Sequence, residues 1–140
     1  MDREIFVYLD HSTRPMQVGR LWARTRKNRE TASFEYGSAW LAHPGRFALE
    51  PALHLGPGPF HTSAGNALFG AIGDSAPDRW GRVLMRRAER RHAESEKRVP
   101  RTLQEIDYLL LVDDETRQGA LRFSEVEGLT TKKAAICLRL

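Results

Sequence analysis

Arginine residues gather in one stretch of the sequence, and they are its strongest candidates for chemistry. Between residues 79 and 101 lie nine basic and three acidic residues, a local excess of six positive charges in a chain whose net charge is +4. Guanidinium groups bind carboxylates and phosphates, so this stripe suits an acidic partner or nucleic acid. The alternative is an ordinary solvated helix face. The candidate partner contacts are Arg79, Arg86, Arg87 and Arg90.

The histidines and acidic residues do not form a metal-binding or catalytic pattern. The five histidines contain no H-x-x-x-H pair, and the single cysteine, Cys137, cannot complete a metal site. The acidic cluster Asp113–Glu115 lacks the spacing of a calcium loop. Asp74 and Asp78 stand before a helical pattern, where helix capping explains them better than acid–base catalysis. We therefore predict no catalytic, cofactor-binding or metal-binding residue.

Motifs for phosphoryl transfer are absent from the sequence. A kinase needs a loop over the nucleotide phosphates, a positioning lysine, acids that hold magnesium and a base. The chain has no G-x-G-x-x-G, no Walker loop, no H-R-D-x-x-x-x-N and no D-F-G. Its four lysines lie in charged or terminal segments. We expect that the chain is not an enzyme.

The first half of the sequence predicts antiparallel β structure. Ile5–Leu9 is a continuous run of β-branched and aromatic residues, typical of a strand buried on both faces. Met16–Ala23 and Thr31–Tyr36 follow as two strands, and the polar residues 25–30 between them predict a hairpin loop. This half is expected to form a small antiparallel sheet or a barrel-like arrangement.

The second half predicts two helices and a closing strand, which makes the fold class α+β. Pro77 and Asp78 resemble the start of a helix that fades into a charged linker from Arg91. Thr102 and Glu105 predict a capping box that opens the second helix. Apolar residues recur at helical spacing in the first helix: Trp80, Val83, Leu84 and Ala88. The closing strand is expected at Gly119–Phe123.

Two segments of the second half carry a specific likeness to a known family, Leu68–Arg86 and Leu103–Phe123. Together they resemble the N-terminal region of HipA-family serine/threonine kinases, which are toxins of type II toxin–antitoxin modules. The chain is also similar to the small stand-alone HipS-like subunit of tripartite systems. We assign residues 1–123 to this subdomain and residues 124–140 to a C-terminal tail of undecided structure. The motif residues are Asp74, Ser75, Pro77, Asp78, Trp80, Gly81, Arg82, Asp107, Tyr108, Gly119, Arg122 and Phe123.

Structural roles are expected first for these motif residues. Trp80 should bury its ring against the sheet as a core anchor, with a partner contact as the alternative. Gly81 should lie where a ring or a backbone segment packs closely.

Two arginines of the motifs are expected to form ion pairs inside the subdomain. Arg82 and Arg122 should pair with Asp107 or Asp113.

The resemblance implies a role without catalysis. In HipA proteins the catalytic residues lie in the C-terminal part, a HipB DNA-binding antitoxin restrains the toxin, and in tripartite systems a separate small protein neutralises it. No position of this chain matches a catalytic residue. We expect a cytoplasmic, non-catalytic interaction subunit that binds a HipA/HipT-like kinase core or a HipB-like antitoxin, without a membrane. The alternatives are a truncated N-terminal piece of a kinase and a weak nucleic-acid binder that uses Arg79–Arg101.

Overall fold

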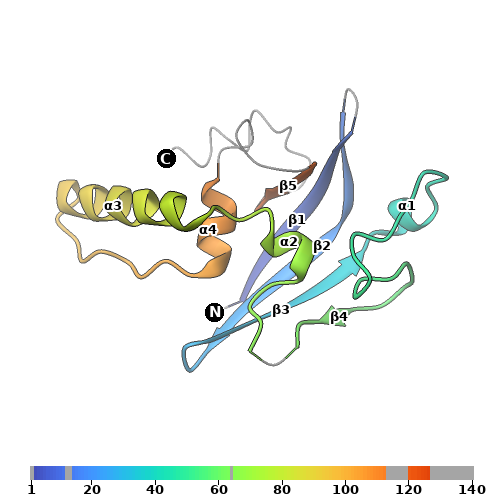
Figure 1. Cartoon of the computed structure of the whole chain (residues 1–140), viewed down its shortest axis with the longest axis horizontal. Helices are drawn as coiled ribbons and strands as arrows, with labels where there is room; N and C mark the ends of the chain where they lie inside the picture. Colours follow the sequence, from blue (N-terminus) through green and yellow to red (C-terminus); the bar gives the residue numbers. More distant parts are fainter. Residues whose placement is uncertain (1, 12–13, 64, 113–119, 127–140) are drawn as a thin grey trace.

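A five-stranded antiparallel sheet is the centre of the fold. The computed structural model describes residues 2–11, 14–63, 65–112 and 120–126. The strands are β1 (Asp2–His11), β2 (Arg14–Arg26), β3 (Arg29–Tyr36), β4 (Phe60–His61) and β5 (Leu121–Ser124). They lie in the order β4-β3-β2-β1-β5 (Figure 1). The sheet is open, with β4 and β5 at its edges, so the predicted α+β fold is confirmed in its sheet form rather than its barrel-like form.

Four helices accompany the sheet in the described part of the chain. They are α1 (Ser38–Leu41), α2 (Gly70–Gly73), α3 (Arg79–Ser95) and α4 (Glu105–Leu111). The two predicted helices correspond to α3 and α4, and the one-turn helices α1 and α2 were not predicted. Figure 1 shows α4 and α2 beside the sheet, whereas most of α3 extends beyond it. No helix in the described ranges is long and apolar enough to cross a membrane.

The core lies on the face of the sheet to which Ile5, Leu21 and Phe34 belong. These residues are register partners on β1, β2 and β3, and all of them are completely buried. Trp40 of α1 is also buried, so it is the tryptophan that anchors the core. Gly19 is required because a Cβ atom there would lie 2.4 Å from the carbonyl oxygen of Glu35.

The boundaries of several elements differ from the sequence predictions. The helix α3 continues to Ser95, because Ala93 and Glu94 are good helix formers and Ala93 is buried. The capping box of α4 is formed by Gln104 and Asp107, two residues later than predicted. The closing strand is β5, shifted by a few residues from the prediction. The predictions for Asp113, for the turn at residues 113–118, for Gly119 and for most of the tail, residues 127–140, lie outside the described residues.

A tight turn joins β2 to β3, where a polar loop was predicted. Arg26 pairs with Arg29 in the sheet register, which leaves only Lys27 and Asn28 in the turn. Both have positive φ angles, 51° and 61°, as a type I′ turn requires. Asparagine tolerates this conformation, but lysine does so only at a cost of about 1 kcal/mol.

The turn gives a prediction about stability. Replacing Lys27 with asparagine should raise the free energy of unfolding by up to about 1 kcal/mol, because asparagine adopts positive φ more easily. Urea unfolding followed by circular dichroism measures the change. Lys97 also has a positive φ angle, 54°, outside the hairpin, so Lys97→Asn should give a gain of similar size by the same mechanism. A Lys27→Asn variant less stable than the wild type would contradict the assigned turn.

Candidate functional site

The start of α3 is fixed by three consecutive features of the motif. Asp78 is the N-cap, and its Oδ1 accepts a hydrogen bond of 2.8 Å from the backbone N–H of Gly81. Gly81 has no side chain where Pro77 approaches, since a Cβ atom at this position would lie 2.9 Å from the Pro77 Cβ. The expected roles of Pro77 and Asp78 at the helix start and of Gly81 in close ring packing agree with this geometry. Asp74 is the C-cap of the preceding α2, and Ser75 is buried beside it.

Arg82 attaches α3 to α4. Its two terminal nitrogens donate to the carboxylate oxygens of Glu105 at 2.6 and 2.8 Å. Its guanidinium also lies over the ring of Tyr108, 4.7 Å from the centroid. The hydrogen bonds to Glu105 raise the pKa of Arg82 above its usual value. Arg86, one turn later, donates to the Tyr108 hydroxyl at 3.2 Å.

The predicted partners of the two motif arginines were wrong where the structure describes them. Arg82 pairs with Glu105 and not with Asp107, because α4 begins at Glu105 and turns that carboxylate toward α3. Arg122 lies 3.6 Å from Asp10 on the neighbouring strand β1. The pairing with Asp113 lies outside the described residues.

Asp107 connects α4 to the sheet instead. Only 4% of the residue is exposed, and its Oδ1 accepts a hydrogen bond of 2.5 Å from Arg3 of β1. Its Oδ2 accepts from the backbone N–H of Gln104 at 2.8 Å, which completes the capping box. Arg101 adds a weaker contact at 3.4 Å. The neighbouring Tyr108 and the β5 residue Phe123 are both buried, so these three motif residues lie in the interior of the fold.

The far end of α3 is also tied down. Glu89 accepts hydrogen bonds from Arg98 and from the backbone N–H of Arg101, at 2.5 and 3.2 Å. These bonds, with that of Arg98 first in strength, lower the pKa of Glu89 below its usual value. Arg98 also donates to Glu96. The segment between α3 and α4 therefore folds back along α3, and the helix is held at both ends.

Trp80 is exposed, which corrects the prediction that it anchors the core. Its exposed fraction is 61%, and that of Leu84, one turn further, is 46%. The reason is the rotation of α3. Arg82 and Arg86 turn toward α4, and Trp80 and Leu84 precede them by two positions, about 200° around the helix. The side of α3 that carries Trp80 and Leu84 therefore faces solvent, and the side that carries Arg82 and the buried Ala93 faces the protein.

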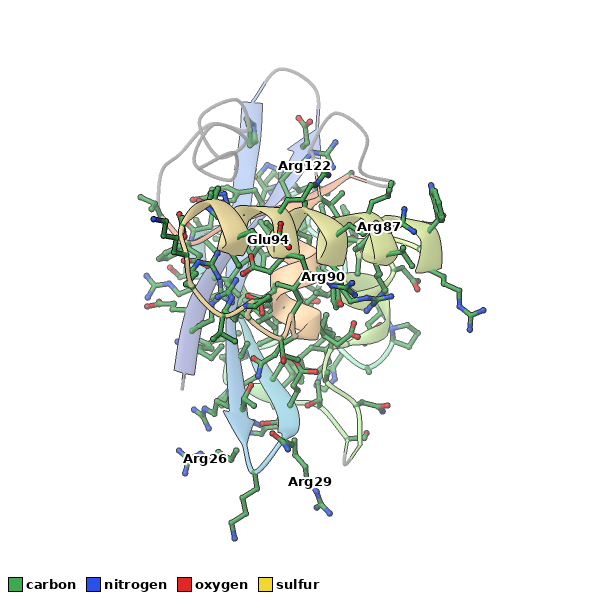
Figure 2. The ribbon with its side chains drawn as sticks, turned by 90° about the vertical axis from the view of Figure 1, so that its left-hand side faces the viewer. Arg26, Arg29, Arg87, Arg90, Glu94 and Arg122 are labelled. Carbon is green, nitrogen blue, oxygen red and sulfur yellow. The ribbon has the colours of Figure 1, made fainter. Side chains whose placement is uncertain are left out.

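The candidate partner contacts divide into two groups. Arg86 is engaged with Tyr108, as described above. Arg79, Arg87 and Arg90 are exposed and form no ion pair with any residue that the structure describes. Figure 2 shows Arg87 and Arg90 projecting from α3, with Glu94 on the same helix. The exposed surface of α3 therefore combines Trp80 and Leu84 with arginines that are available to a partner.

A serine–histidine pair lies at the edge of the sheet but lacks the features of a catalytic site. Ser33 and His61 are register partners on β3 and β4, and the Ser33 hydroxyl lies 2.8 Å from His61 Nδ1. Ser33 is buried, and no described carboxylate orients the imidazole. The pair stabilises the short strand β4. No group of three histidine, cysteine or acidic side chains that could hold a metal occurs among the described residues.

Sequence reasoning missed two groups of residues in this region. Glu105 was assigned only to a capping box, although it fixes the rotation of α3. The cations of the β2–β3 turn, Arg26, Lys27 and Arg29, were treated as part of a polar loop. The local charge of residues 26–29, with three cations and no acid, was the available signal.

Comparison with known proteins gives one match. The model of a family described as the HipA N-terminal domain matches residues 9–107. This range includes β2 to α3, the start of α4 and the end of β1. No curated protein and no solved structure matches the chain.

The attachment of α3 predicts an energetic coupling between two side chains. In a double-mutant cycle, Arg82→Gln and Glu105→Gln should show a coupling of about 1 kcal/mol, because the pair is bidentate and partly shielded from solvent. Urea unfolding measures it. The control cycle is Arg20 and Glu4, a single contact of 3.3 Å on the exposed sheet, with a smaller expected coupling. Equal coupling in the two cycles would show that Arg82 and Glu105 do not fix α3.

A partly buried carboxylate predicts a dependence of stability on pH. Glu30 accepts a hydrogen bond of 2.8 Å from the backbone N–H of Glu105. Burial raises the pKa of Glu30 above its usual value, and the nearby carboxylates of Glu105 and Asp107 act in the same direction. The ionised form of Glu30 is therefore disfavoured in the folded state. The free energy of unfolding of the wild type should fall as the pH rises through the folded-state pKa of Glu30, because the carboxylate then ionises where ionisation is unfavourable.

Glu30→Gln should remove that loss, because the amide keeps an acceptor for the Glu105 N–H without a charge. The variant should be more stable than the wild type near pH 7, and the difference should shrink toward about pH 4, where Glu30 becomes protonated. Melting temperatures across this range, with the exposed Glu35→Gln as the control, measure the effect. A difference that grows as the pH falls would refute this explanation.

Proposed function

Because the chain belongs to the HipA N-terminal domain family, we propose that it is a non-catalytic interaction subunit of a HipA-type toxin–antitoxin module. Its partner is a HipA-like kinase core, which it binds and whose activity it controls in the cytoplasm. The absence of every phosphoryl-transfer motif from the sequence supports a role without catalysis.

The observation that carries this proposal is the exposed apolar side of α3. A tryptophan is the residue most often found at the energetic centre of a protein interface, because its large ring gains much from losing contact with water. Trp80 and Leu84 lie on the same side of the helix, and large parts of both side chains are exposed in the described chain. A partner pocket that receives them would remove this apolar surface from solvent.

The surroundings of α3 prepare the surface for binding. The hydrogen bonds of Arg82 with Glu105 and of Asp78 with Gly81 hold the helix in one orientation before any partner arrives. A rigid surface loses little conformational freedom on binding, so more of the contact energy contributes to affinity. The Trp80 side is therefore suited to a stable and specific contact.

The charges around the apolar residues define the chemistry of the partner. Arg87 and Arg91 follow Trp80 and Leu84 at helical spacing, seven and eleven positions after Trp80. A complementary surface has an apolar pocket bordered by carboxylates. The same surface would pack against a kinase core within one polypeptide if the natural protein continues into one, as in the alternative of an N-terminal kinase piece.

The proposal predicts a large effect of one side chain on binding. Trp80→Ala should weaken binding to a HipA-like kinase core by about 30-fold or more, equivalent to about 2 kcal/mol, because an interface anchor is lost. Titration calorimetry measures the affinity, and growth of cells that express the kinase core measures the control of toxicity. Thermal stability should stay close to that of the wild type, since the ring is exposed.

The matched control is Val99→Ala, which removes an apolar side chain of 85% exposure outside this helix. It should bind as the wild type does. Equal affinity of the Trp80→Ala and Val99→Ala variants would contradict the proposed contact. Binding to a HipB-like antitoxin with no binding to the kinase core would contradict the choice of partner.

A further inference from the structure

A second cationic group lies at the tip of the β2–β3 hairpin, away from the motifs of the family. Arg26, Lys27 and Arg29 are exposed there, and none forms an ion pair with any residue in the described ranges. Figure 2 shows Arg26 and Arg29 at the end of the hairpin. The only acid next to the turn, Glu30, is engaged with the backbone of Glu105. The tip therefore presents positive charge alone.

The composition of this tip is unfavourable for folding. Arg26 and Arg29 are direct register partners, and like charges opposite one another destabilise a strand pair. Lys27 adopts a positive φ angle that a lysine rarely accepts. Neither feature is explained by a contact inside the described chain. A ligand with negative charge would relieve the repulsion between Arg26 and Arg29, and it would also form a contact with the ammonium group of Lys27.

The hairpin tip lies on the same side of the molecule as the exposed arginines of α3. In Figure 2 this side faces the viewer, with Arg87 and Arg90 on α3 and Arg26 and Arg29 below them at the end of the hairpin. The two groups come from different elements that the fold holds in place. The acidic residue Glu94 lies nearer the end of α3 than Arg87 and Arg90, so the cationic surface ends before it (Figure 2).

From this arrangement we infer that this side of the protein binds the phosphate backbone of double-stranded DNA. The two cationic groups are separate and belong to different elements of the fold. A stiff polyanion that carries negative charge along its whole length can contact both groups at once. Duplex DNA carries one phosphate per about 1.7 Å of helix axis and keeps its direction over about 50 nm. A single strand would have to be ordered on binding, and an acidic protein would need two acidic groups at a matching separation.

The binding mode has two properties. Arginine and lysine contacts to phosphates carry no sequence information, so DNA of any sequence should bind. The contact does not depend on Trp80 or on the kinase core, and it therefore extends beyond the proposed function. A subunit that holds its partner at Trp80 and Leu84, and DNA at the hairpin tip and Arg90, would keep the complex near DNA.

The test is the salt dependence of DNA binding by the full chain. Fluorescence anisotropy with a labelled duplex of arbitrary sequence gives the association constant at a series of NaCl concentrations. Each phosphate contact contributes about 0.9 to the slope of log K against log salt concentration. Arg26→Gln and Arg90→Gln should each reduce the slope by about 0.9, and the combined variant by about 1.8. Lys27→Asn should weaken binding in the same way.

The matched control is Arg46→Gln, which lowers the net charge equally in the segment that follows α1, at the other end of the molecule (Figure 1). It should keep the wild-type slope. No binding at low salt, or equal slopes for Arg26→Gln, Arg90→Gln and Arg46→Gln, would overturn the inference. Equally tight binding of a single strand of the same sequence, or of polyglutamate, would also overturn it.

Two variants separate this inference from the proposed function. Trp80→Ala should bind the duplex as the wild type does, although it loses the kinase core. Arg26→Gln should bind the kinase core as the wild type does, although it loses affinity for DNA. Loss of both activities in either variant would mean that the two surfaces are not independent and would overturn the inference.

Discussion

The bidentate contact between Arg82 and Glu105 is the interaction on which the functional surface depends. It fixes how α3 is rotated about its own axis, and the rotation decides which side chains meet solvent. The contact is connected to the sheet, because α4 is held to β1 by Asp107 and Arg3. A chain of polar contacts therefore leads from the first strand to α3. Without it, burial of Trp80 against the body would be the ordinary outcome for an amphipathic helix.

The sequence was sufficient to predict β1, β2, β3, β5 and the two main helices in their order, but not the short strand β4 or the rotation of α3. Strand prediction succeeded because Ile5–Leu9 and Thr31–Tyr36 carry their signal in neighbouring residues. The rotation of α3 could not be predicted, because it depends on a contact between Arg82 and Glu105, which are 23 positions apart. Helical spacing shows only that Trp80 and Leu84 share a side of the helix. The hairpin between β2 and β3 was predicted, but its two-residue turn at Lys27 was not, because the turn lacks the Asn-Gly pair that identifies such turns. Trp40, which belongs to no periodic pattern in the sequence, is the tryptophan buried in the core, as was expected of Trp80.

The paired motifs of the family thus have two physical functions in this chain. Pro77, Asp78, Gly81 and Arg82 build and orient the helix, and Asp107 and Tyr108 provide its attachment on α4. Trp80 belongs to the same motif but adds nothing to the core, which is what a residue reserved for a partner would show. The cationic groups on α3 and the hairpin lie outside these motifs, and they give the protein a second surface of different chemistry.

The most direct measurement of the central claim is oxidative footprinting of the three tryptophans, read by mass spectrometry. In the free chain Trp80 should react readily, whereas Trp40, which is buried, should be protected. Addition of the kinase core should protect Trp80 and leave the reactivity of the partly buried Trp22 unchanged. An unreactive Trp80 in the free chain would contradict the rotation of α3 described above. A Trp80 that stays fully reactive in the complex would contradict its role as the partner contact.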